Sequence, residues 1–253
     1  PGAGSDAGAV SCRAEKVEGG YILNGTKCFI TNAPIADKIT LFANTREGGG
    51  IRGLTVFLVD ADTKGISIGK EEDKMGIRAS ATAEIIFEDC FVPDSARVGK
   101  EGRGFMIAMQ TLQMSRPVVA AISVGIAQAA IEAAVAYSHH RKQFGVKIAT
   151  FEMVQQMIAD MVMKTEEARI LTYKACVAQM NKDKKAGLYS AMSKCFASDT
   201  AMEVTTTAVQ VMGGNGYSRE NPVEKYMRDA KIMQIYEGTN QIQRLVIANE
   251  ATF

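Results

Sequence analysis

The chain has 253 residues, of which 47% are hydrophobic and 23% charged, a composition and length typical of a globular protein with two domains. Its formal net charge of +1 gives no electrostatic basis for nucleic-acid binding. No apolar run approaches the roughly 20 residues of a membrane span, so we expect neither a nucleic acid nor a membrane as partner.

Residues 1–98 are predicted to form a domain of antiparallel strands. The clearest signal is residues 21–31, where β-type residues flank Asn24-Gly25, a pair typical of the type I′ turn of a hairpin. Further strands are expected at 38–44, 52–59, 65–69 and 82–92. This spacing is typical of an antiparallel β-barrel or sandwich.

Residues 99–253 are predicted to form a second, helical domain. Long segments with apolar residues at helical spacing cover 104–140, 149–180, 186–213, 222–235 and 239–250. Alanine and glycine on their apolar faces allow helices to pack closely. The predicted fold class is therefore α+β multidomain, with an all-α domain after the β domain.

Cysteine and histidine usage gives no sign of a metal centre. The five cysteines are widely spaced and include no CxxC pair, so we expect free thiols in a reducing compartment. His139 and His140 are adjacent on one helix and cannot both face a single metal ion. No GxGxxG motif follows a strand, and the glycine-rich run at 213–217 lacks the ending of a P-loop.

The candidate catalytic residue is Glu237, near the C-terminus. Asn221-Pro222 predicts the start of one helix, and Thr239 or Asn240 can cap the next. Glu237 therefore lies between two helices, on backbone bent by Gly238. Spacing alone favours a surface glutamate beside a helix start, whereas a carboxylate held in a turn is a candidate general base.

Five ordered motifs resemble the acyl-CoA dehydrogenase family. They are Pro1–Asp6, Phe29–Asn32, Arg116-Pro117, Arg141–Gly145 and Tyr236–Gln243, the last preceded by Gly213–Tyr217 and Met227–Lys231. The resemblance covers essentially the whole chain and implies that the first four helical segments form an up-and-down four-helix bundle. It also implies that the family's N-terminal helical domain is missing, so that the chain is a fragment.

The resemblance implies an FAD enzyme that converts an acyl-CoA to a trans-2-enoyl-CoA. Glu237 matches the family's general base, which removes the α proton while hydride passes from the β carbon to FAD N5. Ser115 stands where the long-chain and isovaleryl relatives supply the base. With serine there and glutamate at 237, the chain is similar to the short- and medium-chain group, including butyryl-type enzymes.

The resemblance also implies residues for the cofactor and the substrate. Those matching flavin contacts are Phe29, Thr31, Arg141, Gln143, Phe144, Gln210, Gly213, Gly214, Thr239 and Gln241. Those matching acyl-CoA contacts are Ser5, Arg116, Tyr236 and Gly238. Two positions depart from the family pattern, because Phe29 replaces the usual tryptophan and Glu152 stands where many relatives have glutamine.

The family further implies electron-transferring flavoprotein as partner and a homotetramer, a dimer of dimers, with FAD at the dimer interface. A bacterial cytoplasm and a mitochondrial matrix both fit reduced cysteines. Two alternatives stay open: an acyl-CoA oxidase, and a non-catalytic relative that binds flavin, acyl-CoA or DNA. Retention of Glu237 argues against a non-catalytic role, and the near-neutral charge argues against DNA.

Overall fold

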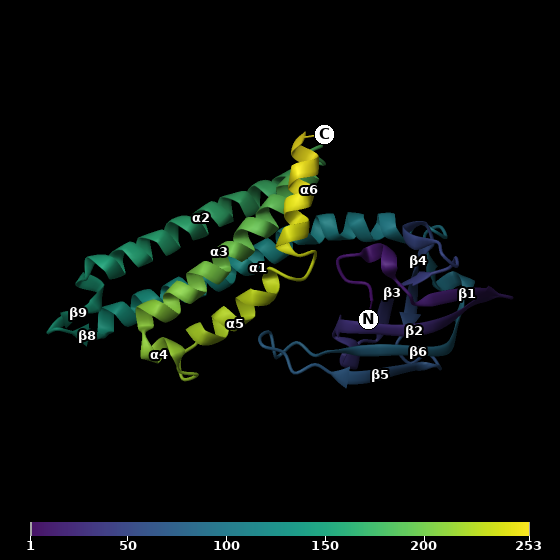
Figure 1. Ribbon diagram of the computed structural model, residues 1–253, viewed down its shortest axis with the longest axis horizontal. Coiled ribbons are helices and arrows are strands. Elements are labelled where there is room, and N and C mark those ends of the chain that lie inside the picture. The colour runs from purple at the N-terminus through teal and green to yellow at the C-terminus, as the bar shows by residue number, and fades with distance from the viewer. Residues whose placement is uncertain (1, 253) are drawn as a thin grey trace. The chain divides into compact units, whose positions relative to one another are not determined.

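The computed structural model describes residues 2–252, and the chain divides into two compact units, one ending at Thr111 and the other beginning at Leu112 (Figure 1). Pro1, the first residue of the motif Pro1–Asp6, lies outside the described residues. The first unit holds a sheet and the second is helical, which confirms the predicted order of a β region and a helical region.

The first unit contains one seven-stranded sheet in the order β5-β6-β2-β1-β3-β4-β7. Its strands are β1 (Arg13–Val17), β2 (Gly20–Thr31), β3 (Lys38–Asn44), β4 (Leu54–Asp60), β5 (Ile66–Glu71), β6 (Thr82–Pro93) and β7 (Arg97–Val98). Neighbouring strands are antiparallel except β1 and β3, which pair in parallel between Arg13 and Asn44. Buried and less buried residues alternate along β3, and buried apolar residues of β1 to β4 and β6 form a core that includes Tyr21, Phe57 and Phe87.

The predicted hairpin at Asn24-Gly25 is wrong. β2 runs without a turn through both residues, and its register against β6 shifts between Leu23 and Gly25. Asn24 exchanges hydrogen bonds with Asp89 on β6, donating at 3.0 Å and accepting from the amide N–H of Asp89 at 2.8 Å. Long-range pairing thus holds the two residues in a bulge, and the hairpin turn lies instead between β1 and β2.

Six helices build the second unit and the link to it. They are α1 (Gly104–His140), α2 (Glu152–Met180), α3 (Ala186–Met212), α4 (Gly214–Tyr217), α5 (Val223–Met233) and α6 (Asn240–Thr252), with a small hairpin of β8 (Lys142–Gln143) and β9 (Val146–Lys147). Short 3-10 helices occupy Ala7–Ala9, Ala33–Ile35, Gly50–Arg52, Asp94–Ala96 and Ile148–Thr150. α2 packs along α3, and α5 and α6 contact α3 (Figure 1).

Small buried residues form the core between the helices. Ala127 and Ala134 of α1 pack in one cluster with Ala201, Val204 and Ala208 of α3. Because alanine side chains are short, they allow the helices to approach closely. α3 is therefore the central helix of the second unit, in contact with α2, α5 and α6.

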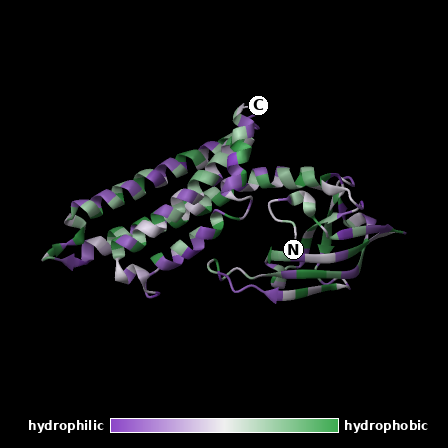
Figure 2. Ribbon diagram, in the orientation of Figure 1, coloured by the Kyte–Doolittle hydropathy of each residue, from purple (hydrophilic) through white to green (hydrophobic). Residues whose placement is uncertain are grey.

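α1 is long and apolar enough, by length and composition, to cross a membrane. This differs from the expectation that no segment reaches that length, because the alanine-rich run in α1 carries few charges. The same helix contributes Ala120, Ala127, Ala130 and Ala134 to buried clusters, and hydrophilic residues interrupt it along its length (Figure 2). The core helix of a globular unit meets the same criteria.

Candidate active site

Glu237 lies in the turn that joins α5 to α6. The amide N–H of Tyr236 donates to the carbonyl of Ile232 at 3.1 Å and continues the last turn of α5. The hydroxyl of Thr239 accepts from the amide N–H of Ile242 at 3.3 Å, as an N-cap residue does. Of the two predicted caps, Thr239 is thus the one observed.

The backbone of this turn is left-handed at two successive residues. Glu237 has φ 59° and Gly238 has φ 86°, and for a residue with a side chain this region is unfavourable. A Cβ atom at Gly238 would lie 2.6 Å from Nε2 of Gln243. Glycine is therefore required at 238 for its conformation and for the close approach of Gln243.

Two buried side chains hold the carbonyl groups of the turn. Nε2 of Gln243 donates to the carbonyls of Glu237 at 3.1 Å and Gly238 at 3.0 Å. Nζ of Lys194 donates to the carbonyl of Gly238 at 2.9 Å. Both side chains are fully buried, and burial lowers the pKa of Lys194 to about 8. The strained turn is thus stabilised from α3 and from α6.

The carboxylate of Glu237 has a neutral donor and a buried cation near it. The hydroxyl of Ser115 donates to Oε2 of Glu237. Arg116 is 7% exposed, and its Nε has no hydrogen-bond partner. Burial lowers the pKa of Arg116, and the negative charges of Glu237 and Glu250 oppose that shift.

A proline in α1 sets the backbone next to Ser115. Pro117 lies inside the helix and has no N–H to donate to the carbonyl of Gln113 four residues earlier. Nε2 of Gln179 on α2 donates to that carbonyl at 3.0 Å, and also to the hydroxyl of Ser190 on α3 at 2.8 Å. The side-chain amide of Gln179 therefore satisfies the carbonyl that Pro117 leaves without a donor, and it links the three long helices.

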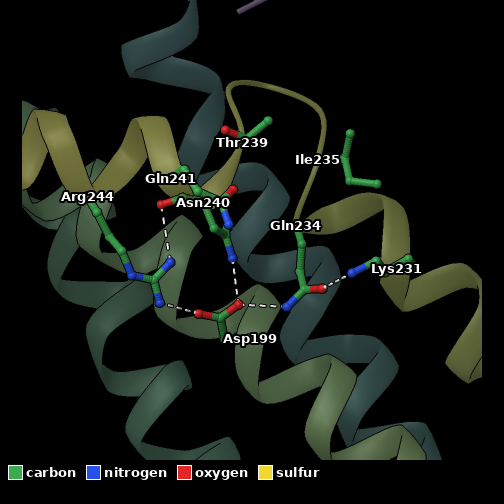
Figure 3. Close-up of a pocket in the computed structure, with 8 residues that line it drawn as sticks. All are labelled: Asp199, Lys231, Gln234, Ile235, Thr239, Asn240, Gln241 and Arg244. Atoms are coloured by element: carbon green, nitrogen blue, oxygen red, sulfur yellow. Dashed lines mark hydrogen bonds and ion pairs between the residues drawn. The ribbon is translucent and has the colours of Figure 1, made fainter.

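A pocket of about 360 Å³ adjoins the turn, between α3, α5 and α6 (Figure 3). Its lining residues are Asp199, Lys231, Gln234, Ile235, Thr239, Asn240, Gln241 and Arg244. Asp199 accepts hydrogen bonds from Arg244 at 2.7 Å, Gln234 at 2.6 Å and Asn240 at 2.7 Å. Burial alone would raise the pKa of Asp199, but these donors hold it below its usual value. Thr239 and Gln241, both predicted flavin contacts, line this polar pocket.

In the first unit, two predicted flavin residues lie at the end of β2. The register of β2 against β6 shifts between Lys27 and Ile30, and Phe29 lies in this irregularity with φ 55°. Its ring is 71% exposed, and Thr31 is also exposed. A bulge can redirect a side chain, and an exposed aromatic ring fits stacking on a planar ring system. Ser5 is exposed as well.

In the second unit, three predicted flavin residues lie on or beside the hairpin β8–β9. They are Arg141, Gln143 and Phe144, all of them exposed. The ring of Phe144 is 94% exposed and its φ is 51°. This ring contacts that of Phe151 edge to face, with 6.1 Å between the centroids, and its exposed surface leaves room for contact with a bound molecule.

The remaining predicted flavin residues lie where α3 ends and α4 begins. Gln210, Gly213 and Gly214 are exposed, and Gly213 has φ 59°. A Cβ atom at either glycine would have no neighbouring atom within 4 Å. Open backbone of this kind leaves room for a diphosphate to approach closely, so the exposed arginine, aromatic ring and glycine pair fit FAD.

The structure brings Tyr236, Glu237, Gly238, Thr239 and Gln241 together in and after the α5–α6 turn. Arg116 of α1 lies near Glu237, and the other predicted residues lie elsewhere in the second unit or in the first unit. The sequence interpretation gave Lys194 and Gln243 no role in holding the turn, and it gave Asn240 only as a possible helix cap. A signal was present for one of them, because Lys194 is the only charged residue in the small-residue run 186–198 and a buried lysine requires polar partners.

Among residues 2–252, no group of three or more His, Cys, Asp or Glu side chains could hold a metal ion. The five cysteines are free thiols, as predicted.

Both parts of the chain are similar to domains of one protein family. The family model described as "Acyl-CoA dehydrogenase, C-terminal domain" matches residues 102–252, and the model described as "Acyl-CoA dehydrogenase, middle domain" matches residues 1–90. The chain is 50% identical over 246 residues to the "Probable acyl-CoA dehydrogenase FadE25" of Mycobacterium tuberculosis, covering 97% of this chain and 63% of the relative.

Two further similarities concern proteins named for their substrates. The chain is 49% identical over 253 residues to the cyclohex-1-ene-1-carbonyl-CoA dehydrogenase of Geobacter metallireducens, covering all of this chain and 67% of the relative. The solved structure of butyryl-CoA dehydrogenase from Megasphaera elsdenii superimposes with a TM-score of 0.98 at 46% identity, covering all of this chain and 66% of that one. The chain thus spans about two thirds of the length of its relatives.

Proposed function

Because this chain belongs to the acyl-CoA dehydrogenase family, we propose that the protein containing it is an FAD-dependent dehydrogenase that converts a short- or medium-chain acyl-CoA to a trans-2-enoyl-CoA. The observation that carries this proposal is the turn at Glu237, where a strained backbone, held by buried donors, presents a carboxylate beside Ser115. The name of the butyryl-CoA relative supports the substrate class.

Glu237 is the base that accepts the α proton of the thioester in this proposal. The proton is a weak acid, so its removal requires stabilisation of the negative charge that develops on the thioester oxygen. The backbone N–H of Glu237 is proposed to donate to that oxygen, and Gly238 is a proposed substrate contact beside it. Tyr236 and Ser5 are the remaining proposed substrate contacts, together with Arg116.

FAD supplies the two-electron acceptor that takes the β hydride. Phe29 and Thr31 are proposed contacts of its ring, and Thr239 and Gln241 are further proposed contacts. The residues of the hairpin β8–β9 and the glycine pair would hold its diphosphate and adenine side across a subunit interface. They are Arg141, Gln143, Phe144, Gln210, Gly213 and Gly214. This arrangement requires at least a dimer, and we propose a homotetramer built as a dimer of dimers.

We further propose that the electrons pass to electron-transferring flavoprotein, in a bacterial cytoplasm or a mitochondrial matrix. One solved structure titled for an electron-transferring flavoprotein of Acidaminococcus fermentans contains a chain 50% identical to this one. A relative titled prolyl acyl carrier protein oxidase, at 33% identity, shows why the electron acceptor has to be measured.

The test is anaerobic addition of butyryl-CoA or octanoyl-CoA to the natural gene product that contains this chain. We expect bleaching of the visible flavin band and formation of the enoyl-CoA. Glu237→Gln should slow bleaching by about 10² to 10⁴, the range for removal of a general base. Glu250→Gln is the matched control, because it removes another carboxylate whose charge acts on Arg116 without touching the turn.

Three results would decide against parts of the proposal. Equal bleaching in the Glu237→Gln variant would exclude Glu237 as the base. A protein that binds no flavin would exclude the dehydrogenase. Reoxidation by oxygen at the rate of turnover, without a flavoprotein acceptor, would identify an acyl-CoA oxidase instead.

A further inference from the structure

We propose that Lys194 is a positioning residue that fixes the carboxylate of Glu237 by holding the carbonyl of Gly238 to α3. This inference rests on the proposed function, since it assigns Glu237 as the base. Lys194 lies 43 positions before Glu237 in the chain, yet its ammonium group reaches the residue next to that base at 2.9 Å. It contacts neither substrate nor cofactor in this assignment.

The ammonium group joins the turn to the first residue of α6. Nζ of Lys194 donates at 2.9 Å to the carbonyl of Gly238 and at 2.9 Å to Oδ1 of Asn240. Asn240 is 2% exposed, and its Nδ2 donates to Asp199 at 2.7 Å and to the carbonyl of Cys195 at 3.3 Å. One lysine on α3 therefore fixes both ends of the segment from the base to the start of α6.

A lysine at this position is unfavourable for stability alone. Its side chain is fully buried, and burial of an ammonium group is costly unless its partners compensate. The charged or titratable groups that act on Lys194 are Cys195 and Asp199 of α3, Arg116 of α1 and Glu237. The negative charge of Glu237 favours the protonated lysine, so the lysine interacts with the base itself.

The turn requires such an anchor because its backbone conformation is unfavourable. Both Glu237 and Gly238 have positive φ, and the left-handed conformation costs about 1–2 kcal/mol for a residue with a Cβ. Gln243 also donates to the carbonyls of Glu237 and Gly238. It lies on α6, the helix that follows directly from the turn, so it does not tie the turn to another part of the unit. Lys194 is the donor that ties the turn to a different helix.

The experiment compares Lys194→Met and Lys194→Gln with the parent protein and with Val204→Ala, a buried control on the same helix away from the turn. Methionine keeps an unbranched apolar stem without a donor, and glutamine restores a neutral N–H donor. We expect Lys194→Met to lower kcat about 100-fold, the effect of a misplacement of about 1 Å. KM should change by less than about threefold.

Lys194→Gln should recover about tenfold of that loss, since it restores a donor for the turn. Val204→Ala should leave kcat within about twofold of the parent. A residue with a purely structural role would lower the amount of folded, flavin-loaded protein and leave kcat per bound flavin unchanged.

Hydrogen exchange gives a second readout that does not depend on catalysis. The amide N–H of Asn240 donates to the carbonyl of Gln234 at 3.0 Å and reports opening of the turn. Its exchange should rise at least about tenfold in Lys194→Met and stay unchanged in Val204→Ala.

The outcomes separate the two proposals. A parent that fails to bleach while Lys194→Met still exchanges faster at Asn240 refutes the proposed function but retains the anchoring of the turn. A Lys194→Met variant with the kcat of the parent per bound flavin overturns the positioning role. If only Lys194→Gln folds, its kcat must lie below that of Val204→Ala, and equality overturns the proposal.

Discussion

Replacing Lys194 should change how stability depends on pH. The ordinary pKa of a lysine is 10.5, and burial lowers that of Lys194 to about 8 in the folded protein. Between these values the folded lysine has lost its proton while the unfolded lysine still carries one. The unfolded state then binds more protons, so the free energy of unfolding rises with pH across this window.

The magnitude follows from the size of the shift. The difference between 10.5 and about 8 is about 2.5 pH units, and each unit corresponds to about 1.36 kcal/mol. Lys194 therefore adds about 3 kcal/mol to the free energy of unfolding when pH rises from below 8 to above 10.5. About 2 kcal/mol of this gain should be present at pH 9.5.

The assay is urea unfolding of the parent and Lys194→Met at several pH values from 7 to 9.5, followed by circular dichroism at a helical wavelength. Tyr236 and Cys195, whose pKa values are raised by burial, lower stability as pH rises, but they do so in both proteins. The difference in unfolding free energy, parent minus variant, should rise by about 2 kcal/mol over this range. A difference constant to within about 0.5 kcal/mol would refute the reasoning.

Two further predictions concern the backbone around the base. Gln179→Leu should lower the free energy of unfolding by about 2 kcal/mol in the presence of Pro117. In a Pro117→Ala background the loss should be about 1 kcal/mol, because the alanine N–H can donate to the carbonyl of Gln113. A coupling energy below about 0.3 kcal/mol in the double-mutant cycle contradicts this prediction. Gly238→Ala should cost about 3 kcal/mol, because the left-handed backbone and the displaced Gln243 add together. Gly145, with φ 81° and open space at Cβ, is the control, and Gly145→Ala should lower the free energy of unfolding only by the backbone contribution, about 1–2 kcal/mol. Equal losses for the two variants would show that Gln243 can move aside at no cost in free energy.

The helices were predictable because their signals are local. The segments predicted at 104–140 and 186–213 are observed at Gly104–His140 and Ala186–Met212, since apolar spacing and helix ends lie within the segment itself. The Asn24-Gly25 hairpin failed for the opposite reason. Its outcome depended on Asp89 of β6, a partner that local turn chemistry does not reveal.

The site divides in the same way. The break between two helices at Glu237 follows from caps and glycine near it in the sequence, and the structure has it there. Ser115 lies 122 residues away from Glu237 in the chain and Lys194 lies 44 residues from Gly238. Which side chains meet the turn depends on the packing of α1 and α3, so the spacing of residues cannot identify them.

The stronger and the weaker hydrogen-bond donors around Glu237 bind different groups of the turn. The charged donor, Lys194, binds a backbone carbonyl of the turn, whereas the carboxylate itself receives a neutral hydroxyl from Ser115. A lysine bonded directly to the carboxylate would stabilise its ionised form and weaken it as a base. Holding the backbone with the strong donor and the side chain with the weak one fixes the position of Glu237 while leaving its capacity to accept a proton. A base on a strained turn requires both a fixed position and a free capacity to accept a proton. Lys194 of α3 meets the first requirement by holding the backbone, and Ser115 of α1 meets the second by giving the carboxylate a neutral donor.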